Sequence, residues 1–467
     1  MRPILSVAEM READAAAQAQ VGIDALVERA GLTLARSARR QMGGTYGRRV
    51  AVVAGPGHNG DDGRVAAAWL GRWGARVMVL PAAGREQLPP QVPDCDLVID
   101  AAYGTGFRGE YQAPWVPRGA GVLSVDIPTG VDGDTGGGCA GAVAAQATVT
   151  FGALKPGLLI GDGPSRSGVI EVADIGLDVS RAAAHLVEDR DVGDVLPARP
   201  RQAHKWQSAL YVAAGSPGML GSASLCSTAA MRAGAGMVRL GVPGASPSDL
   251  PVSEVVASAL PELGWQDQVL EALPRCHGLV VGPGLGTSDV TASAVRKLVA
   301  SAAVPTLLDA DALNVVGSVE ELATLVTQRV ASGTVAPVVV TPHDGEYSRL
   351  VGRPPGPDRF AAARSLAAGS GAVVVLKGST TIVAAPDGRA LVSTAGSPRL
   401  ATAGTGDVLS GVVGAFLAQG VGALEAAALA AHVHGRAAGL GMARGLVAGD
   451  LLELLATYLS GLSGEAP

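Results

Sequence analysis

Short apolar runs alternate with longer amphipathic stretches along almost the whole chain. The stretch 63–73 has the periodicity of a helix, and the opening stretch, roughly 6–41, predicts a long helical segment that packs across a sheet. The apolar runs are short, so we expect strands that are buried on both faces. In the first half of the chain these runs lie at 49–55, 75–80, 96–101, 121–127 and 147–151. This alternation predicts a doubly wound parallel sheet.

A polar, proline-punctuated and charged stretch, 187–207, interrupts the pattern. After it a second series of apolar runs begins, at 209–216, 278–284, 305–311, 337–343 and 372–378. The chain then continues in predicted helices near 405–418, 422–440 and 446–460. We therefore expect two α/β domains, 1–190 and 204–467, joined by a linker at 191–203.

Composition narrows the classes of protein. The 467 residues carry a formal net charge of −6 and no basic stretch, which argues against nucleic acid as a partner. The uncharged stretch 408–424 is short and interrupted by glycine, so we expect a buried helix and no membrane span. Four cysteines without a CxxC motif are typical of reduced thiols in a cytoplasmic protein.

Three glycine-rich motifs follow strands in the first half: AGPGHNGDDGR (54–64), DAAYGTGFRGE (100–110) and DIPTGVDGDTG (126–136). Each motif alone is also compatible with a turn capped by Asx or Thr side chains. Because the carboxyl ends of parallel strands meet at one crevice, the three together favour a binding site. Carboxylates at such a site can transfer protons, and oxygen-bearing side chains can hold a hard cation.

Glycine turns recur in the second half, in GSPGMLGSASL (215–225), VGPGLG (281–286), DADALN (309–314), TPHDGEYSRL (341–350), LKGSTT (376–381) and AGTGD (403–407). Each is compatible with an ordinary turn, His343 with a hydrogen-bonded turn histidine and Asp407 with a helix cap. Together they favour phosphoryl transfer. The amides of 403–406 would form an anion hole at a helix start, and Asp407 would accept a proton from the attacking hydroxyl.

With TFGALKPG (150–157), the first-half motifs resemble the NAD(P)H-hydrate epimerase domain. The resemblance implies a Rossmann-like three-layer αβα fold that binds potassium and interconverts the R and S hydrates of NADH and NADPH. It implies Asn59, Asp100 and Thr129 as potassium ligands and Asp126 as the acid/base group. His58 and Asp61 depart from the usual Asn and Gly. Lys155 would add positive charge near the site, but a lysine next to a proline is more typical of the surface, where we expect it. The implied substrate contacts are His58, Asn59, Gly60, Asp61, Asp62, Gly104, Thr105, Gly106, Phe107, Arg108, Gly109, Glu110 and Asp126.

The second-half motifs resemble the ribokinase superfamily and, within it, the ADP/ATP-dependent NAD(P)H-hydrate dehydratase domain. AHKW (203–206) is similar to the family's HKG entry, with Trp206 in place of Gly. The resemblance implies a ribokinase-like αβα fold that uses ADP or ATP, with Glu346 acting on magnesium through water. The implied contacts with the hydrate are Ala223, Gly284, His343 and Asp407. Those with the nucleotide are Lys377, Gly378, Ser379, Thr380, Thr381 and Gly406.

The resemblances predict a bifunctional enzyme that epimerises hydrated NADH and NADPH and dehydrates the S hydrate, by phosphorylating its hydroxyl and eliminating phosphate. One alternative is a vitamin or sugar kinase of the ribokinase superfamily fused to a Rossmann-like binding domain, but it leaves the first-half motifs unexplained. Another makes the first half a non-catalytic binding module. We expect the partners to be the hydrates and an adenine nucleotide, with no nucleic acid or membrane, and the chain to form a homo-oligomer.

Overall fold

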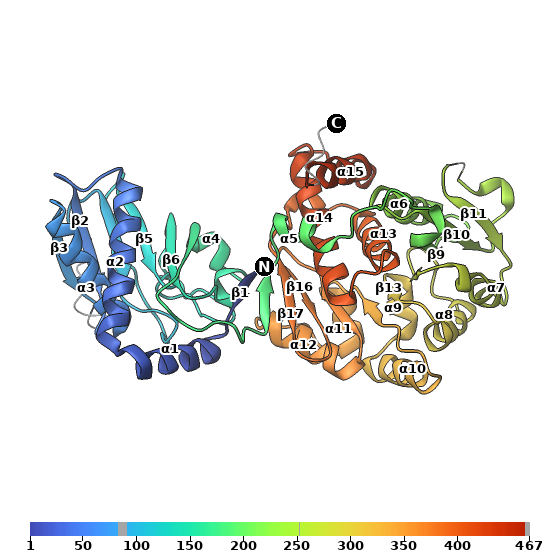
Figure 1. The fold of residues 1–467 in the computed structure, drawn as a ribbon, viewed down its shortest axis with the longest axis horizontal. Coiled ribbons are helices and arrows are strands. Elements are labelled where there is room, and N and C mark those ends of the chain that lie inside the picture. Colours follow the sequence, from blue (N-terminus) through green and yellow to red (C-terminus); the bar gives the residue numbers. More distant parts are fainter. Residues whose placement is uncertain (83–90, 252, 463–467) are drawn as a thin grey trace. The chain divides into compact units, whose positions relative to one another are not determined.

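Two compact units make up the chain. The amino-terminal domain comprises Arg2–Ala184, and the carboxy-terminal domain begins at His185 and also takes in Met1. The computed structural model describes residues 1–82, 91–251 and 253–462 (Figure 1). The division precedes the predicted linker 191–203, because helix α5 (Asp189–Val195) spans the start of that segment and buries Val192 in the carboxy-terminal core.

The amino-terminal domain is built on a parallel sheet with the strand order β3-β2-β4-β5-β6-β7. Each predicted run forms a strand, and β7 follows without having been predicted. At the edge strand β3, Met78 and Val79 are exposed, so the prediction of burial on both faces is wrong there. An edge strand has a partner on one side only. The strands are β1 Arg2–Ile4, β2 Arg49–Ala54, β3 Arg76–Pro81, β4 Leu97–Ala101, β5 Gly121–Val125, β6 Ala147–Phe151 and β7 Val169–Ala173.

The opening stretch forms two helices and not one. At the start of α1, the Ser6 hydroxyl accepts a hydrogen bond from the Glu9 amide (3.2 Å) and the Glu9 carboxylate accepts one from the Ser6 amide (2.7 Å). Gly22 then adopts a φ of 81°, which ends α1 and separates it from α2. Helices α2 and α3 pack together against the sheet around Leu34 and Ile99. The helices are α1 Val7–Val21, α2 Ile23–Met42, α3 His58–Arg72 and α4 Gly163–Ser167.

The carboxy-terminal sheet has the order β17-β16-β15-β14-β13-β12-β9-β10-β11, with β8 beside β17. The strands from β11 to β15 are parallel, whereas β15, β16 and β17 are successively antiparallel. The five predicted runs contain β9 and β12 to β15, while β10, β11, β16 and β17 were not predicted. The strands are β8 Ala184–Leu186, β9 Ala209–Ala213, β10 Met237–Pro243, β11 Val256–Leu260, β12 Gly278–Val281, β13 Thr306–Leu308, β14 Val338–Val340, β15 Val373–Leu376, β16 Thr381–Ala384 and β17 Ala390–Ser393.

Helix α13 lies at the centre of the carboxy-terminal core, against α6, α14 and β12. It approaches closely because Gly411 and Gly414 face its neighbours: a Cβ would lie 2.1 Å from the Cys226 carbonyl oxygen and 2.4 Å from a Val280 methyl, respectively. The predicted helix 446–460 starts later, at Leu451. The helices are α6 Leu220–Arg232, α7 Trp265–Ala272, α8 Asp289–Ser301, α9 Asp311–Val316, α10 Val319–Ala331, α11 Asp344–Val351, α12 Arg359–Ser370, α13 Thr405–Ala418, α14 Ala423–Leu440 and α15 Leu451–Leu462.

Among the helices in the described part of the chain, none combines the length and the apolar character that crossing a membrane requires. The apolar stretch predicted as a buried helix lies largely in α13, whose residues from Val408 to Ala418 are buried in the core.

Candidate functional sites

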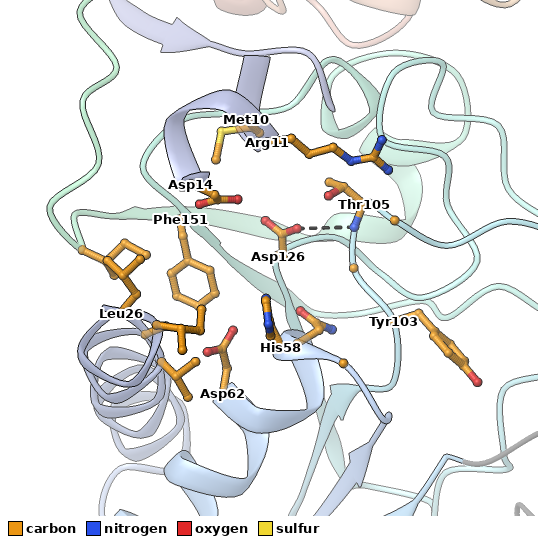
Figure 2. A pocket seen from close by; sticks show the side chains of 18 of the residues that line it. Met10, Arg11, Asp14, Leu26, His58, Asp62, Tyr103, Thr105, Asp126 and Phe151 are labelled. Atoms are coloured by element: carbon orange, nitrogen blue, oxygen red, sulfur yellow. Dashed lines mark hydrogen bonds between the residues drawn. The ribbon is translucent and has the colours of Figure 1, made fainter. Parts of the chain in front are cut away.

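A cavity of about 510 Å³ opens in the amino-terminal domain at the carboxyl ends of β2, β4 and β5. Its walls come from α1 and α2, from the start of α3 and from the loop after β4 (Figure 2). Carboxyl groups from three different elements turn into it: Asp14 on α1, Asp62 on α3 and Asp126 after β5. The charged and titratable side chains that line it are Arg11, Asp14, His58, Asp62, Tyr103, Asp126 and Lys155.

Asp126 is held in place by a buried lysine. The Lys155 Nζ lies 2.7 Å from the Asp126 Oδ1 and also donates to the Thr150 hydroxyl (2.7 Å) and the Phe151 carbonyl oxygen (3.0 Å). The Lys155 side chain is 1% exposed, so the expectation of a surface lysine is wrong. Asp126 has a φ of 67°, a conformation that a non-glycine residue adopts only when its surroundings hold it there. The pair therefore presents a fixed carboxylate to the cavity.

The other two carboxyl groups of the cavity differ from Asp126. Burial, followed by the nearby charges of Asp126, Asp61 and Asp14, raises the pKa of Asp62 to about 8. Burial and Asp126 also raise the pKa of Asp14, whereas Lys155 and His58 lower it. Asp14 remains open to solvent, while Asp62 is 8% exposed. The cavity therefore holds a buried neutral acid close to a lysine-paired carboxylate.

Asp100 lies behind the cavity and is buried. Its carboxylate accepts hydrogen bonds from the Thr129 hydroxyl (2.6 Å), the Thr129 amide (2.9 Å) and the Ser124 hydroxyl (2.9 Å). Burial raises its pKa, and these hydrogen bonds oppose that effect. Within the described residues no lysine or arginine forms an ion pair with it. The Asn59 Nδ2 is likewise buried without a hydrogen-bond partner in this part of the chain. Of the three predicted potassium ligands, Asp100 thus has no basic partner and Asn59 has an unpartnered amide nitrogen within the described residues, whereas the Thr129 hydroxyl is hydrogen-bonded to Asp100.

Most of the predicted substrate residues meet at the cavity, namely His58, Asn59, Asp62, Gly104, Thr105, Gly106, Phe107 and Asp126. Among the described residues, its lining does not include Gly60, Asp61, Arg108, Gly109 and Glu110. Asp61 pairs with Arg64 at 2.8 Å in an exposed ion pair, and Arg108 lies 3.5 Å from Asp132. Gly60 has a packing role, because a Cβ there would lie 1.9 Å from the Gly55 carbonyl oxygen.

Asp407 lies in the first turn of α13, where the sequence expects it. The cap position belongs to Gly404, with a φ of 87°, so Asp407 does not cap the helix. Its carboxyl group is hydrogen-bonded to Ser222 on α6. Burial raises the pKa of Asp407, the Ser222 hydrogen bond opposes this, and Asp309 raises it further. The backbone of Gly284 adjoins the same serine, since a Cβ on Gly284 would lie 3.0 Å from the Ser222 Cβ.

A second lysine, half-buried, lies beside this helix start. The Lys377 Nζ lies 3.0 Å from the Asp309 Oδ1 and 3.5 Å from the Glu346 Oε2. Burial opposes the charge on Lys377, but the two carboxylates outweigh it and raise its pKa. Burial likewise opposes the charge on Asp309, while Lys377, Ser410 and Thr341 hold its pKa below the usual value. A Cβ on Gly406 would lie 3.9 Å from the Lys377 Nζ, so the lysine reaches the first turn of α13.

The other predicted site residues of the carboxy-terminal domain lie at a helix start, in a turn and in the core. His343 begins α11, and its Nδ1 accepts hydrogen bonds from the amides of Gly345 (2.9 Å) and Glu346 (3.3 Å). Residues 377–380 form the turn between β15 and β16, and Thr381 begins β16. The Ala223 side chain is fully buried against Gly215. Trp206, where the family has glycine, lies under the Arg275 guanidinium at 3.9 Å.

Comparison with known proteins decides the family. Residues 210–460 match the NAD(P)H-hydrate dehydratase family, and residues 23–93 and 81–157 match the family described as YjeF-related protein N-terminus. The bifunctional NAD(P)H-hydrate repair enzyme of Mycobacterium leprae is 38% identical over 470 residues, covering 95% of each chain. That of Moorella thermoacetica is 34% identical over 527 residues, covering 99% of this chain and 97% of the relative. The chain belongs to the bifunctional NAD(P)H-hydrate repair enzymes.

Solved structures agree with a ribokinase-like fold in this repair enzyme. The ADP/ATP-dependent NAD(P)H-hydrate dehydratase of Bacillus subtilis, co-crystallised with ATP/Mg²⁺, has a TM-score of 0.50 and 29% identity, covering 59% of this chain and 97% of that chain. A ribokinase-like superfamily protein of Enterococcus faecalis has a TM-score of 0.51 at 21% identity, covering 61% of this chain and 98% of that chain, which shows the fold alone.

Three residues of the repair enzyme's sites were not identified from the sequence: Asp14, Lys155 and Asp309. Asp309 opens the DADALN motif directly after β13, so the strand-end signal that singled out Asp126 applies to it equally. Lys155 lies within a motif that was noticed, but nothing in the sequence indicates its burial. Asp14 reaches the cavity from α1, far along the chain from the strand ends, and no local pattern marks it.

Proposed function

We propose that the two sites carry out successive steps of one repair. The amino-terminal cavity interconverts the R and S hydrates of NADH and NADPH, and the site around Asp407 converts the S hydrate back to the reduced nicotinamide with ADP or ATP. The observation that carries this proposal is that one chain holds both a cavity with a lysine-paired aspartate and a helix start with a half-buried aspartate. A vitamin or sugar kinase would leave the first of these unexplained.

For epimerisation, the protein has only to transfer protons to and from the substrate. The hydrate carries its hydroxyl on a ring carbon next to nitrogen, so inversion proceeds through reversible ring opening or through loss of the hydroxyl. Asp126 takes the hydroxyl proton, because it points into the cavity as an ion-paired carboxylate. Lys155 is the positioning residue that keeps Asp126 charged and fixed. The loop from Gly104 to Phe107 encloses the substrate.

A potassium ion fits the group behind the cavity. Asp100, Thr129 and Asn59 offer carboxylate, hydroxyl and amide oxygens, which suit a hard cation. Asp100 is buried without a basic partner among the described residues, so a cation there would balance its charge. Rotating the Asn59 amide would exchange its unpartnered Nδ2 for an oxygen. Such an ion would fix the strand-end loops around the substrate.

Phosphoryl transfer uses the start of α13. The first amides of this helix have no partner within it and point, with the helix dipole, toward an anion. Asp407 accepts the proton of the attacking hydroxyl, and burial strengthens it as a base by raising its pKa. Gly284 and His343 contact the hydrate, while Lys377, Gly406 and the turn 378–381 contact the nucleotide. Elimination of phosphate from the phosphorylated hydrate then restores the ring.

We expect magnesium to bind at this site together with the phosphates of ADP or ATP. Glu346 is already engaged by Lys377 and by the His343 amide (2.8 Å), which favours a contact with the ion through water. In the described residues no group of three His, Cys, Asp or Glu side chains could hold a metal. This agrees with the general habit of Mg²⁺, which keeps several waters and binds through substrate phosphates.

We place the enzyme in the cytoplasm, which the free state of all four cysteines supports. Its assembly as a homo-oligomer stays a prediction.

The test is to incubate the enzyme with mixed R and S hydrates, with ADP, with ATP and without nucleotide, in potassium or in lithium salt. We expect complete recovery of the reduced-nicotinamide absorbance with nucleotide, and epimerisation alone without it, faster in potassium. Absence of nucleotide-dependent recovery contradicts the dehydratase assignment, and equal epimerisation in both salts contradicts the potassium site.

A further inference from the structure

Asp62 is a carboxyl group whose burial the roles proposed so far leave unexplained. It is the fifth residue of α3, just beyond the first turn, is 8% exposed, and turns into the same cavity as Asp126 (Figure 2). Its neighbour Asp61 pairs with Arg64, whereas within the described residues no hydrogen bond or ion pair satisfies the Asp62 carboxyl. A buried carboxylate without a partner is costly, and protonation removes that cost.

The charges around Asp62 favour its neutral form. Asp126, Asp61 and Asp14 are the carboxyl groups that act on it, and burial is the largest single cause of its raised pKa, about 8. Arg11, His58 and Lys155 also line the cavity. Of these basic side chains, Lys155 forms its ion pair with Asp126, at 2.7 Å, and not with Asp62. One cavity thus holds an unpaired carboxyl group whose surroundings favour its neutral form and a second carboxyl group that is paired with a lysine, a contrast of environments that separates an acid from a base.

We propose that Asp62 is the proton donor of the epimerase site and acts with Asp126, the proton acceptor. This assignment rests on the proposed epimerase function and adds to it a second catalytic residue. The family resemblance gave Asp62 only a binding contact with the substrate.

Protons balance in both routes of inversion. In ring opening, Asp126 takes the hydroxyl proton as Asp62 gives its proton to the ring nitrogen, and the bond between that nitrogen and the hydroxyl-bearing carbon breaks to leave an aldehyde. Rotation of the aldehyde and reversal of both transfers closes the ring on its other face. In hydroxyl loss, Asp62 protonates the departing oxygen, and water adds to the opposite face while Asp126 takes its proton. In ring opening, the reversed transfers return both residues to their starting forms. Hydroxyl loss leaves Asp62 ionised and Asp126 protonated, so one proton must then pass from Asp126 back to Asp62, directly or through water, before the next turnover.

Asp62→Asn in the full-length chain tests this directly, because asparagine keeps the shape of the side chain but has no acidic proton. We expect epimerisation to fall by roughly 10²-fold or more, with nucleotide-dependent dehydration of the pure S hydrate unchanged. Asp94→Asn, at an exposed position of the same domain, is the matched control for loss of one charge. An Asp62→Asn variant with a native circular dichroism spectrum that epimerises within about threefold of wild type overturns the proposal.

The pH profile of the wild-type enzyme gives a second test that requires no variant. The kcat/KM of epimerisation should decline above about pH 8, as Asp62 loses its proton, and the residual activity of Asp62→Asn should lack that decline. A wild-type profile that stays flat to pH 9.5 overturns the proposal. Failure of the proposed function would look different, since wild-type enzyme would then not epimerise at any pH.

Discussion

The two domains each pair a lysine with an aspartate, but the lysine is buried in the amino-terminal domain and half-buried in the carboxy-terminal domain, and the two pairs have different roles. In the amino-terminal domain Lys155 contacts Asp126, which itself faces the cavity. In the carboxy-terminal domain Lys377 contacts Asp309, while Asp407 is hydrogen-bonded to Ser222. The first arrangement pairs the proposed proton acceptor directly with the lysine. The second leaves the acceptor's pKa raised and turns the lysine toward the helix start, where a phosphate would bind.

This contrast follows from the two reactions. Proton transfer to and from the uncharged ring of the hydrate creates no large anion, so carboxyl groups in a cavity suffice. Phosphoryl transfer moves a highly charged group, and the unpaired amides of α13 with a nearby cation meet that need. A lysine–aspartate pair therefore supports proton transfer where it adjoins a cavity lined by carboxyl groups, and phosphoryl transfer where it adjoins the unpaired amides of a helix start.

The largest effect is expected from Asp407→Asn. Asparagine cannot act as a base, so nucleotide-dependent dehydration should fall by roughly 10²- to 10⁴-fold. Nucleotide affinity, measured by calorimetry, should stay nearly unchanged because Lys377 and Gly406 are intact. A folded variant that dehydrates the S hydrate near the wild-type rate would show that Asp407 has a structural role only.

The second-largest effect is expected from Lys155→Met, because this substitution removes the ammonium group that is paired with the Asp126 carboxylate. We expect the amino-terminal domain to lose about 3 kcal/mol of stability, seen as faster hydrogen–deuterium exchange in β6 peptides with no change in α13. Adding Asp126→Asn removes the unpaired charge and should restore most of the protection. Equal exchange in wild type and Lys155→Met would mean that the ion pair contributes little.

The smallest effect is expected from Ser222→Ala. The Ser222 hydrogen bond lowers the pKa of Asp407, so its loss raises that pKa further. Because the base must be deprotonated, the acidic limb of the dehydration profile should move to higher pH by up to about one unit, the worth of one hydrogen bond. The epimerisation profile of the same variant is the control. A shift to lower pH would contradict the assignment of Asp407 as the base.

Local patterns explain what the sequence could predict. Valine-rich runs such as β2 and β15 have few other stable conformations, and the glycine motifs after them mark the strand ends that form both sites. Features that depend on distant contacts were not predictable. Burial of Lys155 requires Thr150 and Asp126 to meet it, and the exposed edge of β3 depends on strand order. The break at Gly22 reflects one dihedral angle in an otherwise helical pattern.

The account's central claim is that two independent sites, one built on Asp126 and one on Asp407, share a single chain. Mixed R and S hydrates with ADP or ATP should be given to Asp126→Asn, to Asp407→Asn and to an equal mixture of the two variants, while the reduced-nicotinamide absorbance is followed. We expect Asp126→Asn to recover the S hydrate and then slow to the spontaneous rate of epimerisation, Asp407→Asn to recover almost nothing, and the mixture to proceed to completion. A mixture that stops where Asp126→Asn stops, or single variants that each lose both activities, would contradict the claim.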